Sequence, residues 1–287
     1  MDKQVREELS ANKPLIYKEY LNIDHLLSLQ KLLSKPRQQD EVLFIIAHQT
    51  YELWFKLTLN ELESAISQML AGDVREATRL IRRVLEVQKV LIQQITVLET
   101  IRPKDFLKFR TLLRPASGFQ SLQFRELEFI SGQKDERFLK MHKDDESDYE
   151  QLLKRYESPS LWDGLREVLE GYGFDVNSDS SRETEKKLRK KELKALVKLF
   201  SGKKYPEVEE LAEVLMEYDK NFWLWRTHHI AMVERVIGRK EGTGSEIVRD
   251  IVGPYAFNTS GVAYLQTSLT KRFFPVLWEA RTEISEA

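Results

Sequence analysis

The hydrophobic and polar positions of this chain repeat with a helical period over almost its whole length. Apolar residues recur at intervals of three and four, and the chain has only 12 Gly and 8 Pro in 287 residues to interrupt that pattern. We therefore expect an all-α protein. The pattern and its Gly, Pro and Asp boundaries predict helices at residues 16–35, 40–71, 73–101, 104–113, 118–131, 206–239 and 273–284. Asp40 and Asp73 are the expected N-terminal caps of the second and third.

Two polar stretches interrupt the apolar pattern. Residues 132–160 contain the acidic run 144–148, which is typical of a solvated loop. Residues 182–194 are rich in Lys and Arg, but their charges alternate in sign, which favours an exposed helix face over a nucleic-acid-binding stripe. Because the chain has no internal repeat and no Pro/Ser-rich linker, a single large helical domain over 1–287 is the simplest division.

The composition narrows the function classes. A hydrophobic content of 41% is enough for a substantial core. Lys and Arg total 45 against 46 Asp and Glu, so the net charge of -1 points to no nucleic-acid or membrane partner. No run approaches the roughly 18 apolar residues of a membrane span, and the first residues include no apolar signal segment, so we expect a soluble cytoplasmic protein. Cysteine is absent, which leaves His, Asp, Glu and Tyr as the strong metal ligands.

One histidine lies in the middle of an aromatic, apolar helical stripe at residues 222–238. An imidazole at His229 cannot be solvated there, so it needs either a hydrogen bond in the core or a metal held against a flat apolar body such as a haem. The spacing alone favours the core histidine, because the chain has no CxxCH and no HxxxH motif. His228 points about 100° away and is the less apolar choice. The helical neighbours of His229 are Phe222, Trp225, Arg226, Met232, Val233 and Val236.

A second histidine, His48, shares a predicted helix face with Phe44 and Phe55. This combination of aromatic rings and an imidazole is typical of a pocket, but a core histidine that binds a carbonyl explains it equally well. Phe106 and Arg110 also share a face, where the arginine could clamp a carboxylate while the ring packs an apolar substrate; a surface arginine is the simpler alternative.

The Gly-Thr-Gly segment at 242–244 follows the His229 helix. No strand precedes it, so a dinucleotide or P-loop interpretation fails on context. Its backbone and the Thr243 hydroxyl could approach a ligand closely, although the isolated signal is weak.

At these residues the sequence resembles the tryptophan 2,3-dioxygenase family, haem enzymes that open the indole ring of L-tryptophan. The similarity is long and its strings are specific. It runs through residues 15–21, 43–56, 98–100, 114–125, 225–244, 260–265 and 272–282.

The resemblance implies a role for each candidate residue. His229 corresponds to the axial ligand of the haem iron, and His48 to the distal catalytic histidine that faces the indole N–H. Arg110 corresponds to the residue that binds the substrate carboxylate, and Thr243 to the residue that holds the amino-acid end. The positions that correspond to the lining of the substrate pocket are Phe44, Ile45, Ile46, Ala47, Phe106, Leu113 and Ser117.

The N-terminal arm, about residues 1–22, resembles the family segment that reaches into a neighbouring subunit's site. Tyr17, Tyr20 and Leu21 match its substrate-binding part. The resemblance therefore implies a homotetramer, a dimer of dimers, with active sites built partly between chains.

The activity implied is the first step of the kynurenine pathway of tryptophan catabolism. Haem b, ferrous in the active form, and O2 would convert L-tryptophan to N-formyl-L-kynurenine. Two alternatives remain: a haem oxygenase of the same fold acting on another aromatic amino acid or indole derivative, and a non-catalytic helical binding protein. The second is disfavoured because His48, Arg110, His229 and Thr243 occur together.

One departure concerns the loop after Thr243. The family has a compact loop there, whereas residues 245–258 of this chain are largely an insertion. Its apolar side chains need cover, so we expect it to pack over the haem pocket or against a neighbouring subunit, where it could change the substrate range. A surface excursion without effect on the site is the alternative.

Overall fold

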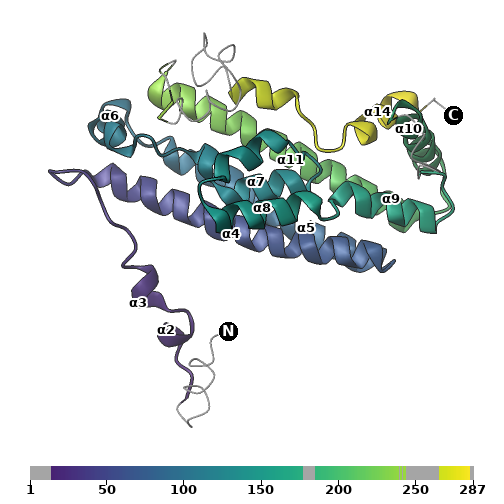
Figure 1. Ribbon diagram of the computed structural model, residues 1–287, viewed down its shortest axis with the longest axis horizontal. Coiled ribbons are helices and arrows are strands. Elements are labelled where there is room, and N and C mark those ends of the chain that lie inside the picture. Colours follow the sequence, from purple (N-terminus) through teal and green to yellow (C-terminus); the bar gives the residue numbers. More distant parts are fainter. Residues whose placement is uncertain (1–13, 177–184, 239, 241, 244–264, 285–287) are drawn as a thin grey trace.

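The computed structural model describes residues 14–176, 185–238, 240, 242–243 and 265–284. Every regular element in these ranges is a helix, which confirms the all-α prediction. Three long helices, α4 (Gln39–Leu70), α5 (Val74–Leu98) and α11 (Pro206–Ile237), lie side by side and pack along their lengths (Figure 1). The shorter elements are α2 (Tyr17–Tyr20), α3 (Ile23–Leu26), α6 (Pro103–Arg110), η1 (Thr111–Leu113), η2 (Gly118–Gln120), α7 (Leu122–Ile130), η3 (Glu136–His142), α8 (Glu146–Glu157), α9 (Leu161–Gly171), α10 (Glu185–Ser201), η5 (Ser268–Thr270) and α14 (Pro275–Glu283).

Helix α5 shows why the sequence forms this bundle. Ile81, Val84, Leu91 and Ile95 are at most 6% exposed and follow one another at helical spacing, so one face of α5 packs into the core. The helix begins after Asp73, whose carboxylate accepts the backbone N–H of Glu76 at 3.0 Å. Polar residues occupy the opposite face, and the apolar stripe therefore determines which side of α5 meets α4 and α11.

A buried carboxylate joins α11 to the C-terminal helix. Asp219 accepts the backbone N–H of Phe273 at 3.1 Å and the indole N–H of Trp278 at 2.8 Å. Pro275 is the first helical residue of α14, where its missing N–H costs nothing. Asp219 therefore orients the start of α14 against the middle of α11.

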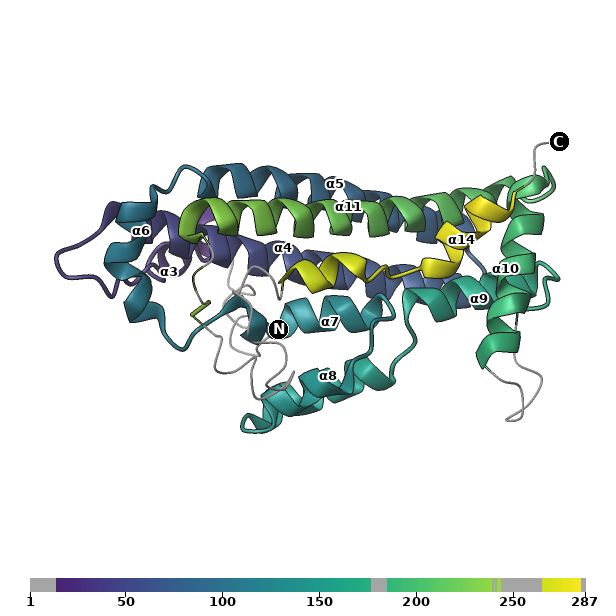
Figure 2. The same ribbon diagram turned by 90° about the horizontal axis from the view of Figure 1, so that it is seen from above.

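One end of the bundle collects segments that are distant in the sequence. Helix α4 begins there, α5 and α11 end there, and α6 crosses the same end (Figure 2). Helices α7 and α9 pack on α4, and α8 packs on α7. At the end near α6, the first turns of α4 and the last turns of α11 are the neighbouring elements.

The helix predicted at 16–35 is wrong. Only α2 and α3 form in this region, and Asn22 between them has a positive φ of 50°. Neither helix contains a buried residue, because these side chains find no partner surface within the described part of this chain. Short helices without packing gain too little to extend.

The polar stretch 132–160 contains η3 and α8. The loop predicted for its acidic run 144–148 is wrong from Glu146 onward, where α8 begins, although residues 144–147 are exposed as expected. Asp145, part of the acidic run, caps α8 by accepting the backbone N–H of Asp148 at 3.1 Å. Leu152 is fully buried with Phe129 and Leu139 in a second, smaller core. At the start of α4 the expected cap Asp40 is wrong as well: the helix begins at Gln39 with no side-chain cap.

None of the helices in the described ranges is long and apolar enough to cross a membrane.

Candidate active site

His48 lies on α4 near the end of the bundle that α6 crosses. Its Nδ1 is 2.7 Å from the Phe44 carbonyl oxygen. A carbonyl can only accept, so Nδ1 carries the proton of the neutral ring and Nε2 presents a lone pair. His48 is exposed in this single chain, but desolvation by the groups around its ring lowers its pKa, while the Phe44 carbonyl and the charge of Glu52 act in the opposite direction. The surroundings therefore favour the neutral imidazole.

Aromatic rings from α4 and α6 form a wall beside His48. The Phe44 ring centroid lies 4.1 Å from that of His48. Phe106 and Phe109 lie 5.7 and 5.9 Å from Phe44, and they meet each other edge to face at 5.2 Å. Phe109, which the sequence interpretation missed, is fully buried and holds α6 against α4. Phe44, His48 and Phe106 therefore lie together at this end of the bundle.

Arg110 is the last residue of α6, the helix that carries Phe106 and Phe109. It is only 7% exposed, so the expected alternative of a surface arginine is wrong. Burial, followed by the positive charge of Arg114, lowers the pKa of Arg110, but a guanidinium remains charged at neutral pH. A buried cation next to aromatic rings can bind an anionic group whose remainder is apolar.

The segment after α11 is tied to the segment after α6. The Thr243 hydroxyl donates to the Ala116 carbonyl at 2.8 Å, and the Ala116 N–H donates to the Leu113 carbonyl at 2.7 Å. Ser117 begins η2 with a capping box that includes the Gln120 side chain. Thr243, Leu113 and Ser117 therefore lie together, although Thr243 follows Ser117 by 126 positions in the sequence.

His229 approaches the same space from α11. The Trp225 indole stacks on it with a centroid distance of 5.5 Å and an interplanar angle of 11°. Burial, and then repulsion from His48, lowers the pKa of His229 to about 4, so the imidazole is neutral near pH 7. No hydrogen bond to His229 occurs within the described residues, so the core hydrogen bond that spacing favoured is wrong. His228 is exposed, as its position on the helix predicts.

A rigid set of side chains supports Trp225 from behind. Its ring contacts Tyr51 at 6.1 Å and Phe124 at 5.6 Å between centroids. The Tyr51 hydroxyl donates to the Leu91 carbonyl at 3.0 Å, so helices α4, α5 and α11 all contribute to this support. The position of Trp225 four residues before His229 was the sequence signal for this contact.

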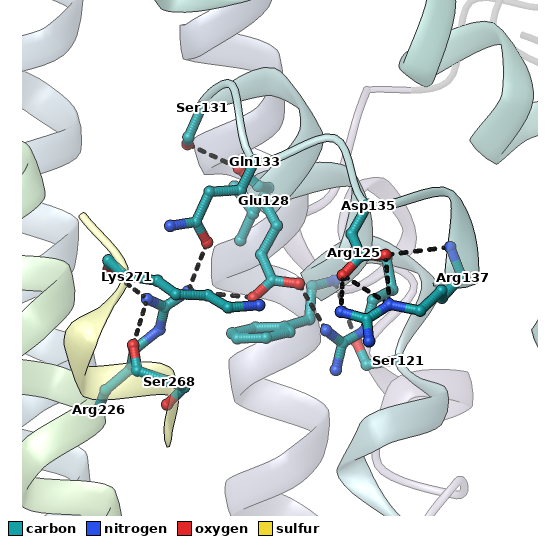
Figure 3. A network of polar contacts seen from close by, with 12 residues as sticks. Ser121, Arg125, Glu128, Ser131, Gln133, Asp135, Arg137, Arg226, Ser268 and Lys271 are labelled. Atoms are coloured by element: carbon teal, nitrogen blue, oxygen red, sulfur yellow. Dashed lines mark hydrogen bonds and ion pairs between the residues drawn. The ribbon is translucent and has the colours of Figure 1, made fainter. Parts of the chain in front are cut away.

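A buried polar network anchors α11 one turn before His229 (Figure 3). Arg226 donates to Glu128 at 3.0 Å and to the carbonyls of Ser268 and Lys271 at 3.3 and 3.2 Å. Glu128 also binds Arg125 on its own helix, α7. The helix that carries His229 is thereby locked to α7 and to the segment before α14.

Glu52 plays a similar role for His48 and was missed from the sequence. It lies one turn after His48 and accepts the Ser121 hydroxyl at 2.7 Å and the Gln123 amide at 2.8 Å. An acidic residue four positions from a histidine on an otherwise apolar helix was the available signal.

Several predicted site residues lie elsewhere in this chain. Ala47 is 5% exposed in the main core, and Ile46 is 45% exposed on the surface of α4, because successive helical residues point about 100° apart. Ile45 is half-buried. Tyr17, Tyr20 and Leu21 are 74%, 71% and 42% exposed, on an arm that extends away from the bundle (Figure 1). The insertion 245–258 lies outside the described residues.

The donor set suits a metal whose other ligands come from a prosthetic group. Within the described residues no three His, Asp or Glu side chains gather as a metal site would require. His229, neutral and held flat against Trp225, offers a single imidazole ligand.

Comparison with known proteins points to one family. The family model described as tryptophan 2,3-dioxygenase matches residues 2–179 and 173–284. A tryptophan 2,3-dioxygenase of Nocardioides sp. is 40% identical over 275 residues, which cover 94% of this chain and 95% of that protein. Those of Herpetosiphon aurantiacus and Arthrobacter sp. are 39% identical over 274 residues (95% of this chain, 100% of that protein) and 36% identical over 291 residues (100% and 97%).

Proposed function

The chain belongs to the tryptophan 2,3-dioxygenase family, and from this premise we propose that it is a haem-dependent dioxygenase that converts L-tryptophan and O2 to N-formyl-L-kynurenine. The proposal includes haem b, a homotetramer built as a dimer of dimers and a cytoplasmic location. One domain of the tryptophan dioxygenase type spans residues 1–287.

The observation that carries the proposal is the meeting of two neutral histidines, an aromatic wall and a buried arginine at one end of the bundle. Trp225, one turn before His229, contacts Tyr51, one turn after His48, at 6.1 Å between ring centroids, and this contact between α4 and α11 supports a space shared by the two histidines. Phe44 and Phe106 bound that space on one side, and Arg110 follows them on α6. A planar aromatic amino acid needs this combination of apolar and cationic surfaces.

His229 is the residue that would hold the haem. Its lowered pKa keeps the imidazole available as a ligand, because a protonated ring cannot bind iron. When bound, the haem supplies the ferrous iron at which O2 is activated. Trp225 supports the ring orientation through its parallel contact, and Arg226 anchors the helix one turn away.

His48 orients the indole rather than removing its proton. Because Nδ1 donates to the Phe44 carbonyl, the free Nε2 lone pair can accept a hydrogen bond from the indole N–H. An indole N–H is a very weak acid, so an imidazole whose pKa is lowered is a poor base for it. Phe44, packed against the imidazole, bounds the position of the indole ring.

Arg110 and Thr243 hold the amino-acid end. The buried guanidinium can form a charge-assisted pair with the substrate carboxylate, which contributes about 1.5–3 kcal/mol in a partly dry site. The hydrogen bond from Thr243 to Ala116 joins the segment after α11 to the segment that contains Leu113 and Ser117. This side of the site is therefore formed from two segments that are distant in the sequence. The lining roles of Ile45, Ile46 and Ala47, and those of Tyr17, Tyr20 and Leu21 across subunits, rest on the family resemblance.

The test of haem ligation compares two adjacent histidines. We expect His229→Ala to lose the visible haem band of the purified protein, whereas the exposed His228→Ala keeps it, because only His229 faces the proposed haem side. Circular dichroism checks that both variants remain helical. Equal haem content in His229→Ala and the unmodified protein would contradict the assignment.

The reaction is tested with the reduced haem protein. Addition of L-tryptophan and air should produce N-formyl-L-kynurenine, identified by mass spectrometry with both atoms of labelled O2 incorporated. Incorporation of a single oxygen atom would indicate a hydroxylating oxygenase. Absence of any product would favour the alternative of a non-catalytic binding protein.

A further inference from the structure

A second concave site lies away from the candidate active site, between η3, α8 and the start of α14. The cleft has a volume of about 710 Å³. Its lining includes none of the residues assigned to tryptophan or haem. Three cationic residues, Lys134, Lys271 and Arg272, face it together with the aromatic or apolar residues Phe138, Tyr156 and Pro275.

The acidic side chains of the cleft already have partners within the protein. Two of them pair with cations, whereas Glu136 keeps its charge and accepts a hydrogen bond from a neutral hydroxyl. The pairs are Glu128 with Arg125 and Arg226, Asp135 with Arg137, and Glu136 with the Tyr156 hydroxyl.

The cationic side chains of the cleft are not matched. Neither Lys134, Lys271 nor Arg272 has a carboxylate within ion-pair distance in the described ranges of the chain. Lys134 donates to the Ser158 carbonyl at 2.6 Å; burial lowers its pKa, and the charge of Asp163 acts in the opposite direction. Figure 3 shows Lys271 beside the network of Arg226 and Glu128. Among the described residues, three cations of the lining without an ion pair thus stand against one such carboxylate, Glu136, so the lining has an excess of positive charge.

Arg272 is held in place without an anion. Its guanidinium lies over the rings of Trp223 and Trp278, 5.0 and 4.6 Å from their centroids. Its Nη1 is buried and has no hydrogen-bond acceptor within the described residues. The guanidinium charge is therefore held at the wall of the cleft, with no carboxylate of the described chain pairing with it.

From these contacts we propose that the cleft binds a small aromatic carboxylate anion. The planar guanidinium matches a carboxylate, and Lys271 and Lys134 add positive charge on the same lining. Phe138, Tyr156 and Pro275 offer apolar surface for a ring, which a simple inorganic anion does not need.

The proposal is tested on the full-length protein with para-fluorobenzoate, followed by fluorine NMR at constant ionic strength. Lys271 is exposed, so Lys271→Glu reverses one charge of the cleft without disturbing the core. We expect this variant to bind the probe about tenfold more weakly. Lys140→Glu, an equal charge change on η3 outside the cleft, should bind it normally.

Two further arms identify the site and the ligand class. Para-fluorobenzoate binding should persist in Arg110→Ala, because the cleft does not include the candidate active site. Fluoroacetate should bind at least about fivefold more weakly than the probe, since it lacks the ring. Unchanged affinity in Lys271→Glu, loss only in Arg110→Ala, or stronger displacement by inorganic phosphate than by benzoate would each overturn the proposal.

Discussion

His228 and His229 are adjacent on α11, yet only His229 lies in a setting that suits a ligand. A rotation of about 100° between successive residues exposes the first ring to solvent and stacks the second on Trp225. The same logic separates Phe44 and His48, which face the candidate site, from Ala47, which packs into the core. For single residues, the helix phase decides which side chains can take part in chemistry.

Arg110 provides a prediction about substrate recognition. Arg110→Ala should weaken L-tryptophan binding by about 10- to 100-fold and leave the binding of 3-methylindole nearly unchanged, because only the amino acid carries a carboxylate. Equilibrium titration of the haem protein with each ligand measures this. Arg114→Ala, the exposed neighbour, is the control, and equal losses for both ligands would contradict a carboxylate role.

Glu126 provides a prediction about pH and stability. Burial raises the pKa of this carboxyl group above its ordinary 4.5, against the opposing effect of the Gln151 amide. The folded protein then binds more protons at Glu126 than the unfolded chain, so its contribution to stability falls as the pH rises through 4.5 towards the raised pKa. Glu126→Gln removes this loss.

We therefore expect Glu126→Gln to raise the melting temperature at neutral pH by about 2 °C, and the gain to vanish near pH 4. Thermal unfolding at both values measures the difference. Glu63→Gln changes an exposed partner of the same Arg155 and should give no gain. A lower melting temperature for Glu126→Gln at neutral pH would show that the ion pair with Arg155 outweighs desolvation.

Among the elements, α8 and α9 show how short helices gain stability from specific contacts. Helix α8 forms within a polar stretch because Asp145 caps it and Leu152 enters a small core with Phe129. Helix α9 approaches α4 closely because Gly164 has no side chain at the contact. A Cβ atom at Gly164 would lie 2.7 Å from the Met69 Sδ and 3.3 Å from its Cβ.

This close contact predicts opposite effects for two substitutions on α9. Gly164→Ala should destabilise the protein by about 1–3 kcal/mol, because Met69 is buried and must shift. Gly171→Ala, on the same helix with open space around it, should be neutral or stabilise by up to about 0.5 kcal/mol. Urea unfolding measures both. Equal effects would mean that α4 and α9 separate without cost.

Across the molecule as a whole, the bundle and the N-terminal arm differ in what supports them. Helices α4, α5 and α11 bury one another, whereas α2 and α3 bury no residue of their own. Gln30 and Gln49 share a hydrogen bond of 2.7 Å that ties the base of the arm to α4 beside His48. The exposed apolar residues of the arm are thus available to a second copy of the chain.

The arm yields a prediction about assembly. Replacing Tyr17, Tyr20 and Leu21 together with Ala should leave helix content and haem binding unchanged, because these side chains are exposed in the single chain. It should weaken the proposed tetramer, measured by sedimentation, and raise the Michaelis constant for tryptophan. Lys31→Ala, an exposed polar change between the arm and α4, is the control. If the variant forms the same oligomer with unchanged kinetics, the arm does not contribute to the active site.

The local pattern of residues was sufficient to predict the helical class, the long helices and the greater burial of His229 than of His228. These properties depend on periodicity and on helix phase, which a linear pattern contains. Asp73 and Gly72 likewise mark the boundary between α4 and α5, with Gly72 at a φ of 79°. The resemblance to a family then supplied roles that spacing alone left open.

The three-dimensional fold determined which contacts those residues make and how deeply they are buried. Periodicity could not show that Arg110 is buried, that Thr243 binds Ala116, or that residues 17–26 lack a surface to pack against. The unpaired charge of Lys271 and Arg272 likewise depends on which carboxylates lie nearby. Burial and ion pairing are relations between distant segments, and chain folding in three dimensions, rather than local pattern, sets them.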